Sequence, residues 1–178
     1  EIEFAGTFNA HLRSLYNTQA GGHAYAFTQF EPIYARQAFP CFDEPRFKTP
    51  FELTLRVPQG LVAVANTRVA HQTDLAGGQT EFHFARTEKL PTYLVAFAVG
   101  PLDVIEAASI APNEIRPEAL PLRGVAARGR GPELAFALKE TPRLLDSLER
   151  YFGIAYPYDK LDLIAVPDFA SGAMENAG

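Results

Sequence analysis

The sequence predicts a mainly β fold, with an antiparallel, saddle-like sheet or sandwich first and an α+β region after it. Apolar and polar residues alternate over 51–57 and again over 80–85, and a period of two places one strand face in a core and the other in water. The chain also carries 13 glycines and 14 prolines, which favour many turns. A helical repeat of leucines appears only late, over 134–152.

Further strands are expected at 61–65 and 93–99. Residues 74–78 (Asp-Leu-Ala-Gly-Gly) have the turn chemistry of a hairpin-like return. The stretch 93–99 is almost continuously apolar, which is typical of a strand covered on both faces. The sheet is expected to end near 100–106.

The composition then changes, because residues 108–131 are rich in proline, glycine and arginine. This indicates a connection between two domains, with one short strand near 122–125. A helix is expected from Pro132 to a stop at Gly153, with Pro142 kinking or splitting it. A last strand is expected at 161–166, and 169–176 is too small and turn-prone for one. These boundaries give a β-domain over 1–107 and a second domain that begins in 108–178.

Composition excludes several classes of protein. The 178 residues are 47% hydrophobic and 21% charged, as in a globular protein with a packed core. The net charge of −5 offers no general positive field for nucleic acid or an anionic membrane. The longest apolar run, 93–99, is far below the roughly 18 residues of a membrane span. A single cysteine, Cys41, allows neither an internal disulfide nor a cysteine metal cage.

Local concentrations of charge and nucleophiles have ordinary interpretations. The arginines at 116, 123, 128 and 130 are expected in a solvated loop. Cys41 is expected to be a small buried hydrophobic residue. The four histidines, His11, His23, His71 and His83, are scattered, and no second histidine follows at the spacing of a zinc-binding helix.

Two carboxylates stand out by their neighbours. Glu31 precedes Pro32, which forces an extended bend, and Glu175 ends a run of small residues where backbone can approach a ligand closely. By spacing alone, pairing with Arg36 or with solvent is the simpler interpretation.

Several longer motifs resemble the zinc aminopeptidases of the aminopeptidase N family. These motifs are Thr-Gln-Phe-Glu-Pro at 28–32, Ala-Arg-Gln-Ala-Phe-Pro-Cys-Phe-Asp-Glu-Pro at 35–45, and Tyr-Phe-Gly through Val-Pro-Asp-Phe over 151–169. Gly-Ala-Met-Glu-Asn at 172–176 matches the exopeptidase motif of that family residue for residue. The likeness extends over essentially the whole chain.

The resemblance implies a β-domain followed by the start of a thermolysin-like catalytic domain, in a hydrolase that removes the first residue of a peptide. It implies that Glu31 and Glu175 bind the free amino terminus and that backbone at Gly172 and Ala173 lines the substrate. The substrate-binding set is therefore Glu31, Gly172, Ala173, Met174, Glu175 and Asn176. A carboxylate 4 Å from an ammonium group contributes about 4 kcal/mol at an effective dielectric of 20, before desolvation.

The zinc site of the family, His-Glu-x-x-His with a further glutamate, is absent from the sequence. We therefore expect no metal ligand and no catalytic residue in this chain, and zinc only in a longer parent protein. Both ends look cut, and the chain alone is expected to be inactive. Its expected partners are peptides with a free amino terminus and the rest of the catalytic domain, without nucleic acid or a membrane segment.

Two alternatives stay open from the sequence. One is a non-catalytic β-sandwich that binds or scaffolds, in a degenerate family member. The other is a bifunctional epoxide hydrolase of the same family, although the carboxylate at Glu31 disfavours it, because that branch carries an amide there. The compartment is undetermined, with the cytoplasm favoured.

Overall fold

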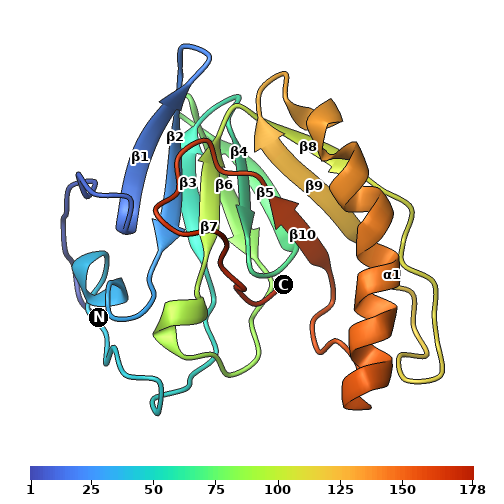
Figure 1. Cartoon of the computed structure of the whole chain (residues 1–178). Helices are drawn as coiled ribbons and strands as arrows, with labels where there is room; N and C mark the ends of the chain where they lie inside the picture. Colours follow the sequence, from blue (N-terminus) through green and yellow to red (C-terminus); the bar gives the residue numbers. More distant parts are fainter. The chain divides into compact units, whose positions relative to one another are not determined.

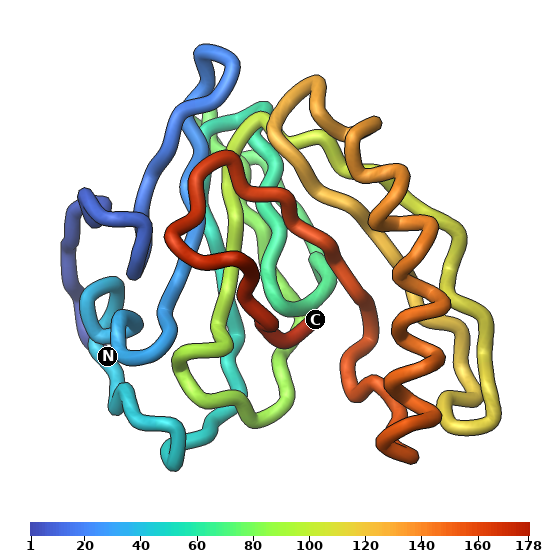
Figure 2. Tube along the Cα trace, viewed as in Figure 1, coloured from blue at the N-terminus to red at the C-terminus, as the bar shows by residue number.

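The computed structural model describes all 178 residues, and their contacts divide the chain into two compact units (Figures 1 and 2). The first unit comprises residues 1–101 and 166–177, and the second comprises 102–165 with Gly178. Antiparallel sheets dominate, and the one α-helix lies late in the chain. This confirms the predicted mainly β fold.

The first unit contains a four-stranded antiparallel sheet in the order β1-β2-β7-β4. Its strands are β1 (Ser14–Ala20), β2 (His23–Gln29), β7 (Phe97–Gly100) and β4 (Val62–Ala65). The β1–β2 hairpin was not among the expected strands, because β1 mixes polar and apolar residues. Gly21 and Gly22 close it with positive φ angles of 58° and 77°, which glycine adopts without steric cost.

A second sheet of the first unit has the order β3-β6-β5, from β3 (Thr54–Pro58), β6 (Gln79–Phe84) and β5 (Val69–Leu75). The predicted alternation is confirmed. Val57, Phe82 and Phe84 are buried with Ala63 and Ala65 of the other sheet, in one hydrophobic cluster. The expected turn is confirmed as the β5–β6 connection, whereas β5 itself was missed because six of its seven residues are exposed.

The expectation of a strand over 93–99 is wrong in its first half. Thr92–Leu94 form the short 3₁₀ helix η2, and β7 begins only at Phe97. The side chain of Asn66 explains the difference, because its Nδ2 donates to Leu94 O and its Oδ1 accepts from Ala96 N, both at 2.8 Å. A side chain thus takes the backbone bonds that a neighbouring strand would otherwise make.

A short 3₁₀ helix, η1 (Ala35–Gln37), follows β2 and packs into a small cluster with Phe30 and Val95. Cys41 packs against this cluster and is half-buried rather than fully buried. Arg36 pairs with Asp43 and not with Glu31.

The second unit has its own three-stranded sheet in the order β10-β9-β8. Strand β9 (Leu122–Ala127) runs parallel to β10 (Leu161–Ile164) and antiparallel to β8 (Leu102–Glu106). The strand expected near 122–125 is confirmed, and the one expected over 161–166 is confirmed but ends at Ile164. The segment 100–106 does not end the first sheet as expected, because β8 pairs with β9.

The helix forms as a 3₁₀ turn, η3 (Gly131–Leu134), and then α1 (Ala135–Phe152), which ends at Gly153 with φ of 66°. Pro142 does not split it, since α1 continues through the proline. Leu145 is buried in a cluster with Leu120 and Leu122, and Leu138 packs against the same cluster. Leu138 precedes Pro142 and Leu145 follows it, so both halves of α1 pack against the same cluster and the helix stays continuous.

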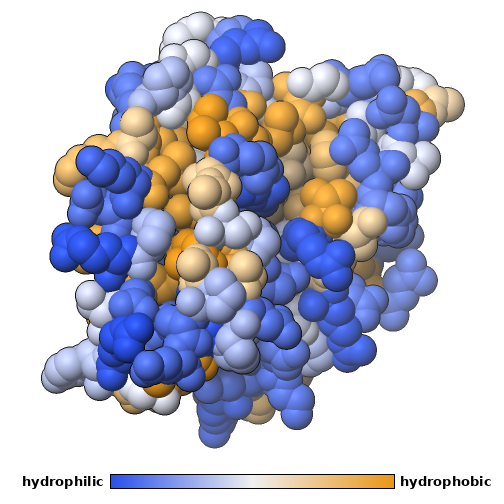
Figure 3. Space-filling model, turned by 90° about the vertical axis from the view of Figure 1, so that its right-hand side faces the viewer, coloured by the Kyte–Doolittle hydropathy of each residue, from blue (hydrophilic) through white to orange (hydrophobic).

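Two positions of the predicted helix stripe are not in the core. Leu148 and Phe152 are 54% and 64% exposed, and Glu149 between them is buried instead. Apolar and polar side chains are intermixed on the face of the molecule drawn in Figure 3. No helix is long and apolar enough to cross a membrane.

The arginines of the connection are not all in a solvated loop, as was expected. Arg116 is 5% exposed and its Nε lies 3.0 Å from Oε1 of Glu149, which is 2% exposed. Asn113 donates to the second oxygen of Glu149 at 2.7 Å. Arg123 binds both carboxylate oxygens of Asp162, at 2.8 and 2.6 Å. Buried carboxylates therefore hold these cations in fixed positions.

Burial opposes ionisation of Glu149, but hydrogen bonds from the Tyr156 backbone and Asn113, together with Arg116, outweigh it and lower the pKa of Glu149. Because that pKa is lower in the folded chain, the carboxylate stabilises the fold at neutral pH. The contribution is lost as the pH falls below the ordinary range of glutamate, near 4.3.

We expect Glu149→Gln to lower the free energy of unfolding at pH 7 by about 3 to 5 kcal/mol, because Arg116 would stay buried without its counter-charge. The difference from the unchanged chain should shrink below about pH 4. Urea unfolding across this pH range measures both effects. Glu133→Gln, at an exposed pair with Arg130, is the control and should leave the unfolding transition almost unchanged, because water screens that pair. Equal effects of the two variants would contradict the assignment.

Candidate functional site

The exopeptidase motif lies in a segment that belongs to the first unit although it follows β10 in the chain. Residues 165–178 form no helix or strand, which agrees with the expectation for 169–176. Figure 1 shows this last part of the chain, in red, passing over β2 and β7 toward the C-terminus. Contacts with the four-stranded sheet hold it at both ends.

Asp168 makes the first of these contacts, with strand β1. The Thr18 hydroxyl donates a short hydrogen bond to the Asp168 carboxylate, and the Tyr16 hydroxyl donates to the Asp168 carbonyl at 3.2 Å. Burial and the nearby Asp168 charge raise the pKa of Tyr16 to about 12. The phenol therefore keeps its proton at neutral pH and acts as a donor.

Ala177 makes the second contact, beside the end of β4. Asn66 Nδ2 donates to the Ala177 carbonyl at 2.8 Å, in addition to the bonds that it makes to Leu94 and Ala96. Asn66 is only 7% exposed and Ala177 only 3%. A buried amide with three short bonds is a rigid point of attachment.

Strands β1 and β4 are the two edges of the sheet β1-β2-β7-β4. A chain attached at Asp168 beside β1 and at Ala177 beside β4 must pass across the central strands β2 and β7. The residues of the motif lie between the two attachments. Gly172, Ala173 and Glu175 are exposed, and Met174 and Asn176 are half-buried.

The backbone at Gly172 is open. A Cβ built on this glycine would meet no atom within 4 Å. The space beside the main chain at this point is therefore free of the protein's own side chains.

Glu31, the other predicted anchor, lies two residues beyond the end of β2. Its peptide bond to Pro32 is cis, and Tyr34 N bonds to Phe30 O at 2.8 Å in the turn that follows. Glu31 is exposed, as is Glu175. Neither carboxylate takes part in a hydrogen bond or ion pair of the chain. Whether the two side chains bind one ligand stays a prediction.

Gln29 is a polar residue of the same motif that the predicted site did not include. In the hairpin register Gln29 is opposite Ser14, and Phe27 is opposite Tyr16, so Gln29 shares a sheet face with Tyr16 and Thr18. This is the face that Asp168 contacts. Gln29 is 8% exposed, and its Oε1 is buried with no hydrogen-bond partner. Such an acceptor is costly unless something binds it.

Sequence reasoning could have found Gln29 only from the strand register. Once β2 is recognised as a strand, a glutamine on the face of Tyr25 and Phe27 is a polar residue among buried aromatic ones. The missed β1–β2 hairpin concealed this signal.

No group of three or more histidine, cysteine, aspartate or glutamate side chains could hold a metal ion. The rings of His71 and His83 stack at 4.1 Å, but Nε2 of His83 bonds to Glu81 and its Nδ1 to Thr54. Residues of this chain therefore do not fit the zinc that the resemblance implies.

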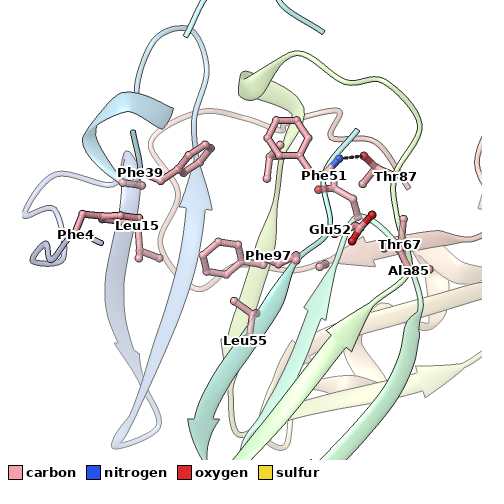
Figure 4. Close-up of a pocket in the computed structure, with 15 residues that line it drawn as sticks. Phe4, Leu15, Phe39, Phe51, Glu52, Leu55, Thr67, Ala85, Thr87 and Phe97 are labelled. Carbon is pink, nitrogen blue, oxygen red and sulfur yellow. Dashed lines mark hydrogen bonds between the residues drawn. The ribbon is translucent and has the colours of Figure 1, made fainter. Parts of the chain in front are cut away.

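An apolar pocket of about 320 Å³ lies elsewhere in the first unit, between its two sheets (Figure 4). Phe39, Phe51, Phe97 and Leu55 line it, and Glu52 is the one charged residue among its walls. None of the predicted site residues lines this pocket. It lies on the face of the four-stranded sheet opposite to Tyr16, since Leu15 is part of the wall.

Comparison with known proteins places these features in a family. Residues 1–94 match the model of the peptidase M1 N-terminal domain, and residues 136–178 match that of the peptidase family M1 domain. The first match alone covers more than half of the chain.

Three relatives illustrate the likeness. Aminopeptidase M1-C of Oryza sativa subsp. japonica is 40% identical over 181 residues, which cover 99% of this chain and 20% of the relative. The puromycin-sensitive aminopeptidase of Caenorhabditis elegans is 40% identical, over 100% of this chain and 19% of the relative. Endoplasmic reticulum aminopeptidase 2 of Bos taurus is 39% identical, with shares of 100% and 18%.

The chain spans about one fifth of the length of these curated relatives. Its likeness to them runs from end to end, through the strand that carries Gln29 and the segment attached at Asp168 and Ala177. The chain therefore belongs to the peptidase M1 family.

Proposed function

We propose that the whole protein is a zinc-dependent aminopeptidase and that this chain binds the free amino terminus of its peptide substrate. One observation carries the proposal: two exposed carboxylates, Glu31 and Glu175, have no partner in the chain, and they lie in the turn after β2 and in the segment that crosses the sheet. The three relatives compared above carry the name aminopeptidase, which favours an enzyme over a non-catalytic scaffold.

A protonated amino terminus suits this arrangement. The α-amine has an ordinary pKa of about 7.7 to 8.0, and neighbouring carboxylates favour its charged form. Gln29 lies on the sheet face that Asp168 contacts, and Glu31 follows two residues later in the turn after β2. The unpartnered oxygen of Gln29 is a further acceptor for an N–H of the ligand.

The open backbone at Gly172 gives room for the peptide itself. Because no side chain covers that glycine, a ligand's main chain can approach it and exchange hydrogen bonds with the segment. Fixing the amine at Glu31 and Glu175 then sets the distance to the first peptide bond. An internal stretch of peptide has no amine and would leave both carboxylates unpaired.

The zinc of the proposed enzyme is bound by residues outside this chain. The ligands described above for the family, two histidines and a glutamate, have no counterpart among its side chains. A zinc ion held by residues elsewhere in the protein would supply Lewis-acid activation of water. The residues of this chain hold and orient the substrate.

In the full-length protein, we expect Glu175→Gln and Glu31→Gln each to lower kcat/KM for peptides with a free amine by about 10- to 100-fold, because a charged hydrogen bond is lost. Activity on aminoacyl p-nitroanilides, compared with their Nα-acetylated forms, measures the preference. Glu3→Gln, in the irregular segment 1–8, is the matched control and should leave it unchanged. If both variants kept the normal preference for a free amine, the anchoring role would be wrong.

We expect Gln29→Met to raise the free energy of unfolding of the chain by about 1 kcal/mol, because a similar apolar side chain replaces a buried acceptor without a partner. The same change should raise KM of the full-length protein several-fold. Thermal unfolding and steady-state kinetics test the two effects. Gln19→Met, at an exposed position of β1, is the control. A variant that is less stable and kinetically normal would contradict this role of Gln29.

The isolated 178-residue chain should not hydrolyse aminoacyl p-nitroanilides, with or without added zinc, because the proposed metal ligands lie elsewhere. Release of p-nitroaniline by the purified chain measures this activity, with the full-length protein as the positive control. Zinc-dependent turnover that survives removal of contaminating peptidases would show that the chain holds its own catalytic centre.

A further inference from the structure

Three side chains of the first sheet hold the two ends of the exopeptidase segment. Thr18 and Tyr16 bind Asp168 beside β1, and Asn66 binds the Ala177 carbonyl beside β4. The Asn66–Ala177 bond is buried, whereas the Thr18–Asp168 bond joins a buried hydroxyl to an exposed carboxylate. We call the contacts Thr18–Asp168 and Asn66–Ala177 the clasp.

Between these contacts the segment has no regular structure of its own to fix its course. Residues 169–176 form neither helix nor strand and include Gly172. Glu175 lies only two residues before Ala177, and its side chain has no partner within the chain. The position of this carboxylate is therefore determined mainly by where the clasp holds the backbone.

The contacts of the clasp are better suited to positioning the exopeptidase segment than to merely keeping it on the sheet. Apolar packing alone would hold a covering segment in place without choosing a register along the sheet. Hydrogen bonds to two specific strands fix the segment in both directions, across the sheet and along it. Displacement of a binding group by about 1 Å is enough to cost about 100-fold in a preorganised site.

We propose that Thr18, Asp168 and Asn66 are positioning residues, which place the Glu175 carboxylate where it can share one ammonium group with Glu31. This inference rests on the proposed function, in which these two carboxylates bind the substrate's amino terminus. The clasp acts on substrate only through Glu175. It contributes to the preference for a free amine and not to the chemical step.

Thr18→Val in the full-length protein tests the clasp, because valine keeps the shape of threonine and removes the hydroxyl donor. We expect KM for free-amine peptides to rise about tenfold, with kcat within about twofold of normal. Thr18→Ser should restore KM. Thr73→Val, at an exposed position of β5, is the matched control and should have normal kinetics.

A double-mutant cycle with Glu175→Gln separates positioning from general support of the fold. If the clasp acts through Glu175, Thr18→Val should add less than about a twofold effect once the carboxylate is gone. Asp168→Ala changes an exposed side chain and should show the same coupling, so it serves as the second variant if Thr18→Val folds poorly.

The outcomes distinguish the two proposals. A normal preference in Glu175→Gln overturns the anchoring itself, and the clasp with it. A clear loss in Glu175→Gln, combined with a Thr18→Val effect that is absent, equal in both backgrounds or equal for Nα-acetylated peptides, overturns the clasp alone. Loss of the Thr18 effect in the Glu175→Gln background supports both.

Discussion

The register of the β1–β2 hairpin decides which side chains meet the exopeptidase segment. Pairing of Ser14 with Gln29 and of Tyr16 with Phe27 places Tyr16, Thr18 and Gln29 on one face. A slip by one residue would turn this whole set to the other face, toward the second sheet. The attachment of Asp168 and the unpartnered acceptor at Gln29 both depend on this single choice of pairing.

The parts of the fold that the sequence predicted are those with a strong local period. Strands β3 and β6 and helix α1 follow from alternation, helical spacing and the stop at Gly153. The misses share a different cause. At η2, Asn66 takes backbone bonds from a distance of 28 and 30 residues, and at Leu148 the helix buries Glu149 instead of a leucine. Long-range polar contacts have no period that a sequence window can detect.

The candidate site divides in the same way. The residue types of the exopeptidase motif and of Glu31 were predictable through family resemblance, because the motif letters are contiguous. The side chains that attach the motif, Thr18 and Asn66, are separated from it by more than 100 residues and belong to no motif. Gln29 is an intermediate case. The residue belongs to the motif and can be identified from the sequence, but the burial of its Oε1 without a partner follows only from the fold.

The bond between Thr18 and Asp168 joins residues 150 positions apart. A ribosome that adds about 5 to 20 residues per second needs roughly 8 to 30 seconds to deliver that stretch. During that interval the hairpin has been made but the segment that crosses it has not. The face that carries Tyr16 and Phe27 is therefore not yet covered by that segment. Until residue 168 has left the exit tunnel, this face of the hairpin is one of the surfaces through which a nascent chain can aggregate.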